Sequence, residues 1–294
     1  MIQRANPSTN AKARSFPFVC LARVLLNRYN RIHLEMINRK VVFYLRILLI
    51  RHAEPDYTVD SLTPKGRVEA ELLSRRLVHY DIRDFYVSPL GRARDTAAYT
   101  LEKLNRQAET LPWLHEFMGS YPDPETGVRR IVAWDVKPRI WTSFPGVTDI
   151  RTWCDAPAFS GGDVREVWKQ TTDGVDELLG RYGYIKDGPV WRCEQNGDFT
   201  LALFCHFGIS MAVLAYLTDV SPMVLWHHTL CLPSSITEIV TEERIRGEVS
   251  FRMTKLGDLT HLEAAGEKRS TAGLFPECYT GIDSTDPAVN GTLK

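Results

Sequence analysis

The stretch VVFYLRILLI at residues 41–50 runs directly into RHAEP at residues 51–55. Ten mostly apolar residues, many of them branched or aromatic and interrupted by a single arginine, predict a β-strand that is buried on both faces. A polar loop follows at the carboxyl end of this strand. In layered α/β folds, binding and catalytic residues gather at the carboxyl ends of strands, so this junction indicates both the fold and the place of a site.

Two later segments repeat this order of apolar strand, polar loop and helix. Residues 84–87 and 201–205 are the predicted strands, and apolar residues at helical spacing follow each loop. Thr63-Pro64 predicts the start of another helix, with a capping hydroxyl before a first-turn proline. Two further strands are expected at 236–240 and 249–253. We therefore predict a three-layer α/β sandwich with a mostly parallel central sheet flanked by helices.

The predicted domain covers residues 45–265 and contains a long insertion at about 117–198. This insertion is rich in proline and tryptophan and lacks regular periodicity until a helix expected at 164–179. Long irregular segments in compact domains are often lids or binding loops, so we expect a lid or cap whose tryptophans contact substrate or pack on the main domain. Residues 266–294, rich in Thr, Ser, Gly and Pro, predict a poorly ordered tail.

Residues 1–44 form a basic extension with eight Lys or Arg and one acid, Glu35. Two interpretations stay open: a targeting or membrane-surface segment, or a stretch that is not part of the natural protein. No apolar run is long enough to predict a membrane span. The six cysteines show no CxxC spacing, which favours reduced thiols and a cytoplasmic protein. The sequence does not indicate an oligomeric state.

The net charge of the chain indicates which class of binding partner to expect. Lys+Arg and Asp+Glu number 36 each, and this zero net charge argues against a nucleic-acid binder, which usually carries a basic excess. A small anionic substrate needs only a few local cations. No metal or other cofactor is expected, because the adjacent His227 and His228 lack carboxylate or cysteine partners at ligand spacing.

Three polar residues or pairs follow the predicted strands: Arg51-His52, Arg92 and His206. A neutral imidazole can attack phosphorus, and an arginine can bind phosphate oxygens through its planar fork of donors. Taken alone, each of these residues also has a non-functional interpretation. An arginine at a helix start can simply be solvated, and a core histidine can simply have its hydrogen bonds satisfied. Their recurrence at strand ends favours a shared functional site over these ordinary alternatives.

Together these segments resemble the histidine phosphatase superfamily, also called phosphoglycerate-mutase-like. The resemblance rests on RHAE at 51–54, SPLGRARDTA at 88–97, His206 with Gly208, and DLTHL at 258–262, which looks like the closing strand region. It covers roughly residues 45–265. All motifs occur in order with compatible spacing, which makes the resemblance specific.

The resemblance implies a role for each matching residue. His52 would be the phosphorylated nucleophile, and Arg51, Arg92 and His206 would hold the phosphoryl group. Glu116, after the second motif, is the best match to the proton donor of the family. A phosphate monoester dianion would be held by these cations, and the departing alkoxide would take its proton from Glu116.

Three residues depart from the family pattern or flank it. Phe207 replaces a small residue after the second histidine and narrows the pocket, while its backbone N–H stays available to a substrate oxygen. Asp56 and Tyr57 are expected at the pocket rim from their proximity to His52. The loop at 54–57 also differs from the sequence that follows the first histidine in cofactor-dependent mutases, which favours a phosphatase.

The expected function is hydrolysis of a small phosphorylated metabolite through a phosphohistidine. Two alternatives share the fold: a mutase that returns the phosphoryl group to a second hydroxyl, and a catalytically inactive phosphate-binding module. A sugar- or nucleotide-binding protein of generic α/β type is a further alternative, and it predicts no covalent phosphoenzyme. The physiological substrate is not indicated.

Overall fold

The structure is a computed structural model that describes residues 45–123, 127, 130–194 and 197–274. The predictions for residues 1–44 and 275–294 lie outside these residues. The strands are β1 (Leu45–Arg51), β2 (Pro55–Asp56), β3 (Ser61–Leu62), β4 (Ile82–Val87), β5 (Glu109–Thr110), β6 (Ser120–Pro122), β7 (Arg130–Val132), β8 (Tyr184–Asp187), β9 (Val190–Cys193), β10 (Phe199–Cys205), β11 (Ile236–Ile245) and β12 (Glu248–Asp258). The helices are α2 (Pro64–Leu77), α3 (Gly91–Leu104), α4 (Pro138–Trp141), α5 (Val164–Gly180), α6 (Phe207–Thr218), α7 (Pro222–His228) and α8 (Thr260–Ala264), with short 3-10 turns at Pro112–Leu114, Trp153–Asp155 and Pro157–Phe159.

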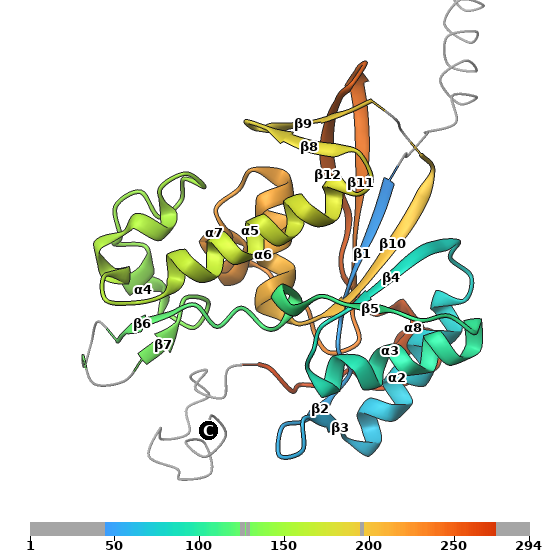
Figure 1. Cartoon of the computed structure of the whole chain (residues 1–294). Coiled ribbons are helices and arrows are strands. Elements are labelled where there is room, and N and C mark those ends of the chain that lie inside the picture. The colour runs from blue at the N-terminus through green and yellow to red at the C-terminus, as the bar shows by residue number, and fades with distance from the viewer. Residues whose placement is uncertain (1–44, 124–126, 128–129, 195–196, 275–294) are drawn as a thin grey trace, which may run out of the picture. The chain divides into compact units, whose positions relative to one another are not determined.

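Eight strands form the central sheet in the order β5-β4-β10-β1-β11-β12-β9-β8 (Figure 1). The half that contains β5, β4, β10 and β1 is parallel, whereas β11, β12, β9 and β8 add to it in antiparallel fashion. The predicted α/β layered fold is confirmed, with its parallel strands forming one half of the sheet. The strands expected from the sequence are the ones that build its centre.

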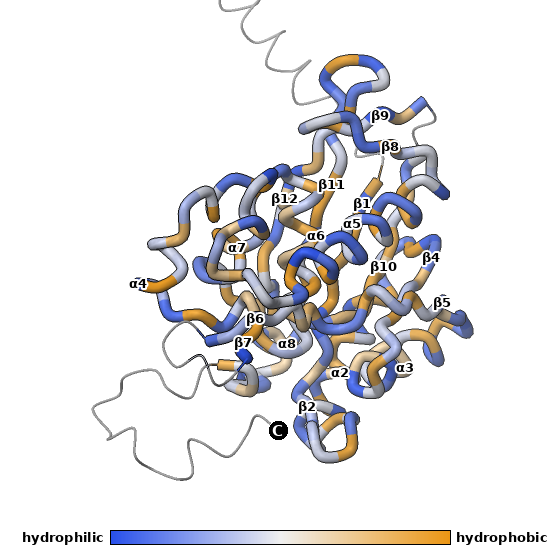
Figure 2. The backbone as a smooth tube through the Cα atoms, turned by 60° about the vertical axis from the view of Figure 1, so that its left-hand side comes forward, coloured by the Kyte–Doolittle hydropathy of each residue, from blue (hydrophilic) through white to orange (hydrophobic). Residues whose placement is uncertain are grey.

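The two faces of β1 join two different hydrophobic clusters. Ile47 and Leu49 pack in the cluster that contains residues of α5 and α6, and Leu48 and Ile50 pack in the cluster that contains residues of α2 and α3. Figure 1 shows these helix pairs on opposite sides of the sheet, and Figure 2 shows hydrophobic positions recurring along the central strands. Because successive strand side chains point to opposite faces, a continuous apolar run is what a doubly covered strand requires.

Helix α2 begins where the sequence predicted, at a capping threonine followed by a proline. The Thr63 hydroxyl accepts a hydrogen bond from the Gly66 N–H, and Pro64 occupies the first turn. Gly66 itself is needed for packing, since a β-carbon there would lie 2.1 Å from the carbonyl oxygen of Glu54. Helix α2 is thereby held against the loop that follows β1.

The segment predicted as an insertion, 117–198, contributes in two ways. From Val164 onward it belongs to the layered fold, because α5 packs on α6 and strands β8 and β9 extend the sheet. Its earlier, irregular part carries the β6–β7 hairpin and α4. Trp141 and Trp153 are buried in the main hydrophobic cluster, so these two tryptophans pack rather than line a substrate pocket. A lid function for the irregular part stays a prediction.

Two expectations about the carboxyl-terminal region need correction. Residues 258–262 do not form a closing strand, because β12 ends at Asp258 and the short helix α8 follows. The predicted poorly ordered tail begins too early, because Glu267 and Ser270 make defined hydrogen bonds and Ser270 is buried. Hydrogen-bond partners far away in the sequence order this stretch, which composition alone could not indicate.

Within the described residues, no helix is both long and apolar enough to cross a membrane.

The buried tryptophans allow a test of this packing. Trp153 is fully buried and makes edge contacts with the rings of Phe159, Trp168 and Trp226 at centroid distances of 5.9, 5.3 and 5.5 Å. We expect Trp153→Ala to lower the free energy of unfolding by about 3–5 kcal/mol in urea denaturation, because it leaves a large cavity. Ile185→Ala, at an exposed position, should change it by less than about 0.5 kcal/mol. Equal effects would contradict the packing described.

Candidate active site

Backbone hydrogen bonds continue the parallel sheet beyond its strand ends. The N–H of His52 donates to the carbonyl of Cys205 at 2.9 Å, and the N–H of Ser88 donates to that of Phe204 at 2.9 Å. The three loops after β1, β4 and β10 therefore start side by side. The rings of His52 and His206 lie 5.1 Å apart between centroids, so the two predicted histidines do meet at the carboxyl edge of the sheet.

The backbone orients His52. Its Nδ1 lies 2.8 Å from the carbonyl oxygen of Ala53, and because a carbonyl only accepts, Nδ1 carries the proton. The lone pair is then on Nε2. Burial, followed by the charges of Arg51 and Arg92, lowers the pKa of His52 well below its usual value. The imidazole is thus neutral at physiological pH, which is the form that can act as a nucleophile.

His206 is held by Ser88. The Nε2 of His206 lies 2.7 Å from the Ser88 hydroxyl oxygen, which also accepts a hydrogen bond from the Leu90 N–H at 3.2 Å. With the pKa of His206 lowered by burial and by the nearby His52, Arg92 and Arg51, its ring is neutral. We assign the Ser88 hydroxyl as donor to Nε2, which places the ring proton on Nδ1.

The guanidinium of Arg51 is buried at the end of β1. Its Nη1 donates to the carbonyl of Cys231 at 2.5 Å, and its Cζ lies 5.8 Å from the ring centroid of Phe207. Burial lowers the pKa of Arg51, and the charge of Glu116 opposes this shift. An arginine keeps its proton nonetheless, so the group is a fixed positive charge.

The β2–β3 hairpin holds the side chain of Arg92 in place. The β2–β3 turn carries Asp60, whose two carboxylate oxygens accept from Arg92 Nη1 and from the Gly91 N–H, each at 2.6 Å. Burial acts to raise the pKa of Asp60, but these hydrogen bonds outweigh it and the pKa is lowered. Tyr57 of the same hairpin also lies near this arginine, with its ring centroid 5.4 Å from Arg92 Cζ. The hairpin therefore fixes the direction of the arginine.

Three buried nitrogens of these residues have no hydrogen-bond partner within the described part of the chain: His206 Nδ1, Arg51 Nε and Arg92 Nε. All three are N–H donors in the protonation states assigned above. Helices α3 and α6 begin beside them, and helix amino ends favour anions. Buried donors in native proteins are normally paired, so this set indicates a site for an anion with several acceptor oxygens.

Glu116 lies beside this group of donors. Its Oε1 accepts from the backbone N–H groups of Phe117 and Ile209 at 2.8 and 3.0 Å. Burial raises the pKa of Glu116, although these hydrogen bonds and the charges of Arg51 and Arg92 act against it. A carboxyl with a raised pKa next to a cationic site can hold a proton to give away.

The glycine after Phe207 leaves room for this carboxyl. A β-carbon at Gly208 would lie 2.7 Å from Glu116 Oε1 and 2.9 Å from the indole of Trp134. Trp134 in turn donates its Nε1–H to the carbonyl of Phe117 at 2.6 Å. Trp134, a tryptophan of the predicted lid, thus lies against Gly208 and Phe117, which are both neighbours of the candidate proton donor.

The structure brings together Arg51, His52, Arg92, Glu116 and His206, with Phe207 and Tyr57 beside the arginines. Asp56 instead uses its carboxylate within the hairpin, where it accepts from the N–H and hydroxyl of Thr58. Its place at the pocket rim stays a prediction. Sequence reasoning missed the roles of Ser88 and Asp60. Ser88 opens the quoted SPLGRARDTA segment, which is a signal that could have identified it, whereas nothing local marks Asp60.

Within the described residues, no three His, Cys, Asp or Glu side chains are grouped so that they could hold a metal ion. His227, which the sequence analysis considered for this role, stacks on Trp141 with ring centroids 4.9 Å apart and an interplanar angle of 13°.

A family model matches most of this chain. The model of the histidine phosphatase superfamily (branch 1) matches residues 47–252, which is more than half of the chain and includes all five central residues of the site.

Two characterised proteins are similar in sequence. The adenosylcobalamin/alpha-ribazole phosphatase of Salmonella typhi is 24% identical over 192 residues, which cover 62% of this chain and 84% of that protein. The 2,3-bisphosphoglycerate-dependent phosphoglycerate mutase of Thermoplasma acidophilum is 38% identical over 73 residues. That match covers 21% of this chain and only 36% of the mutase.

Solved structures with a similar arrangement include two phosphatases. A mutant phosphoserine phosphatase from Entamoeba histolytica in complex with phosphoserine is 18% identical, with a TM-score of 0.49, and the match covers 74% of this chain and 99% of that one. A mycobacterial glucosyl-3-phosphoglycerate phosphatase is 21% identical, with a TM-score of 0.49 and coverage of 72% and 98%.

The hydrogen bond from Arg92 to Asp60 leads to a testable expectation. In Asp60→Asn one carboxylate oxygen becomes an NH2 group, which donates and cannot accept from Arg92 or Gly91, and the arginine also loses a charged partner. We expect the affinity for inorganic phosphate to fall about tenfold in calorimetric titration. Asp81→Asn, which changes an exposed carboxylate, is the control and should bind like the unmodified chain. Unchanged affinity in Asp60→Asn would show that the hairpin does not orient Arg92.

Proposed function

Since this chain belongs to the histidine phosphatase superfamily (branch 1), we propose that it hydrolyses a small phosphomonoester through a phosphohistidine at His52. The observation that carries the proposal is a set of three buried donors, His206 Nδ1, Arg51 Nε and Arg92 Nε, that find no partner among the described residues. They surround an imidazole whose unprotonated nitrogen is Nε2. A phosphoryl group supplies the acceptor oxygens that these donors need. The same site supplies the nucleophile.

In the first step, His52 Nε2 attacks phosphorus and the bond between phosphorus and the ester oxygen breaks. Arg51, Arg92 and His206 donate to the equatorial oxygens, which carry the charge as the bond breaks. The leaving alkoxide takes the proton of Glu116. The dianionic substrate adds negative charge beside Glu116, which favours the protonated carboxyl until transfer.

In the second step, a water molecule attacks the phosphohistidine. Glu116, now a carboxylate, accepts a proton from this water, and the N–P bond breaks as the new P–O bond forms. Inorganic phosphate leaves, His52 returns to its neutral form and Glu116 is protonated again. One carboxyl thus serves as acid and then as base.

A mutase reaction is the second candidate, because one relative of similar sequence is named a phosphoglycerate mutase. It would use the same first step and return the phosphoryl group to a second hydroxyl. The loop at 54–57 departs from the mutase sequence pattern, which favours the hydrolase. The two reactions are distinguished with a monoester whose alcohol has no second hydroxyl group. A phosphatase releases inorganic phosphate from it, whereas a mutase has no hydroxyl to which it can return the phosphoryl group.

The proposed function is tested with p-nitrophenyl phosphate, with EDTA present throughout. We expect turnover by the unmodified chain to persist in EDTA and to fall by at least about a thousandfold in His52→Ala, because the nucleophile is lost. His79→Ala, which removes an exposed histidine, is the matched control and should retain full activity. Activity retained by His52→Ala would refute the proposal.

A second expectation concerns pH. Only protonated Glu116 can serve a poor leaving group, so kcat/KM for an alkyl phosphate should decline as pH rises through the raised pKa of this carboxyl. The profile is measured above the second pKa of the monoester, about 6, where the substrate is a dianion. Protonation of His52 limits activity only well below the usual histidine pKa, because that pKa is lowered.

Glu116→Gln provides the check on this assignment. It should lower kcat/KM for the alkyl phosphate by about 10²–10⁴ and remove the decline at high pH. A p-nitrophenol burst should remain, because this leaving group departs without a proton. An unchanged pH profile in the variant would assign the proton donor elsewhere.

A further inference from the structure

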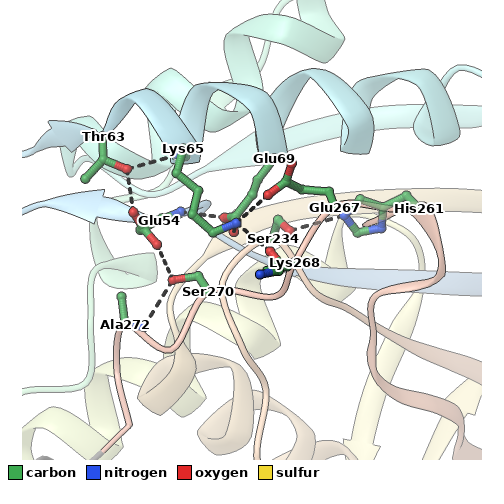
Figure 3. A network of polar contacts seen from close by, with 11 residues as sticks. Glu54, Thr63, Lys65, Glu69, Ser234, His261, Glu267, Lys268, Ser270 and Ala272 are labelled. Atoms are coloured by element: carbon green, nitrogen blue, oxygen red, sulfur yellow. Dashed lines mark hydrogen bonds and ion pairs between the residues drawn. The ribbon is translucent and has the colours of Figure 1, made fainter. Parts of the chain in front are cut away.

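The residues after helix α8 return across the loop that carries His52. Residues 267–274, termed the C-terminal strap, lie beyond the part of the chain that matches the family model, which ends at residue 252. Figure 3 shows the strap beside Glu54 and the first turn of α2, with dashed lines joining the three elements. The strap makes three contacts: with helix α2, with the loop that carries His52, and with Arg51.

The first contact fixes the start of the strap to α2. Lys65 Nζ donates to a carboxylate oxygen of Glu267 at 2.6 Å and to the carbonyl of Lys268 at 2.5 Å (Figure 3). The buried carboxylate of Glu69 lies 3.7 Å from the same ammonium group. This lysine therefore ties the strap to the helix that packs under the His52 loop.

The second contact reaches the His52 loop itself. The hydroxyl of Ser270, which is 2% exposed, donates to Glu54 Oε2 at 2.6 Å. Thr63 donates to the other oxygen of Glu54 at 2.8 Å, and the Glu54 N–H donates to Glu69 at 2.8 Å. Glu54 follows His52 by two residues, so the strap supplies one of the bonds that hold this loop.

The third contact is with Arg51. Gly273 has a φ of +86°, and a β-carbon there would lie 2.2 Å from Arg51 Nη2 and 3.1 Å from its Cζ. The strap backbone is therefore packed against the guanidinium. The Cys231 carbonyl at Nη1 and the Phe207 ring approach the same guanidinium. These neighbours fix its orientation, and its Nε has no hydrogen-bond partner among the described residues.

We propose that the C-terminal strap completes the active site, with Gly273 and Ser270 as positioning residues that fix Arg51 and the His52 loop for the phosphoryl group. This inference rests on the proposed function, because it assigns the strap to the same phosphate site. The strap acts through Arg51 and Glu54 and does not itself bind the phosphoryl group. The strap lies outside the region that the family model matches, residues 47–252.

Two glycines provide a matched test. Gly273→Ala and Gly266→Ala both place a β-carbon at a positive φ, +86° and +70°, but no atom of the described residues lies within 4 Å of the new carbon at Gly266. We expect Gly273→Ala to lower kcat/KM for p-nitrophenyl phosphate about 10- to 100-fold, because displacement of a positioned group by about 1 Å has effects of this size. Gly266→Ala should retain near-normal kcat/KM. Their melting temperatures should be similar, which separates positioning from folding.

Ser270→Ala tests the second contact in the full chain. Loss of the hydroxyl frees one oxygen of Glu54, and we expect a severalfold loss of kcat/KM, whereas Thr271→Ala at the exposed neighbouring position should have no effect. Equal activities of Gly273→Ala and Gly266→Ala would overturn the proposal. An activity increase in Gly273→Ala would also overturn it, because the strap would then block the site.

Binding of inorganic phosphate, measured by calorimetry, separates this proposal from the proposed function. If the unmodified chain binds phosphate but does not hydrolyse monoesters, the proposed function fails. The strap is then judged by binding alone, where Gly273→Ala should weaken the affinity about tenfold or more and Gly266→Ala should not. If the unmodified chain binds no phosphate, both proposals are refuted.

Discussion

The position of the whole site depends on the parallel pairing of β1, β10 and β4. One more backbone hydrogen bond after β1, and another after β4, continue this pairing into the loops. The bonds from His52 to Cys205 and from Ser88 to Phe204 fix the relative height of three loops. A shift of register by one residue would turn His52 and the apolar residues of β1 to the opposite faces. Doubly buried strands resist such a shift, because both hydrophobic clusters would be lost.

A second constraint is the neutrality of the two histidines beside two arginines. Burial and the neighbouring positive charges keep His52 and His206 uncharged, so each ring has one donor and one acceptor nitrogen. The carbonyl of Ala53 and the hydroxyl of Ser88 then determine which nitrogen faces the site. The electrostatics and the hydrogen bonds thus leave His52 with a lone pair and His206 with an N–H on the free ring nitrogen, although the two side chains are chemically identical.

The sequence predicted the parts of this arrangement that are encoded locally. Apolar runs marked β1, β4 and β10, Thr63-Pro64 marked the start of α2, and the motifs around Arg51, Arg92 and His206 marked the polar loops. Contacts between distant residues were not predictable in this way. Asp60 reaches Arg92 only when a hairpin folds over α3, and Ser270 reaches Glu54 across 216 positions of sequence. The Ser- and Thr-rich composition of the tail predicted disorder because composition carries no information on such partners.

The central claim is that phosphate becomes bonded to His52 during turnover. The most direct measurement is rapid quenching of the unmodified chain with a ³²P-labelled monoester in alkali, which preserves phosphohistidine, followed by identification of the labelled peptide by mass spectrometry. We predict acid-labile label on the peptide that contains His52 and no labelled peptide from His52→Ala. Label on His206, or rapid hydrolysis without a labelled enzyme, would contradict it.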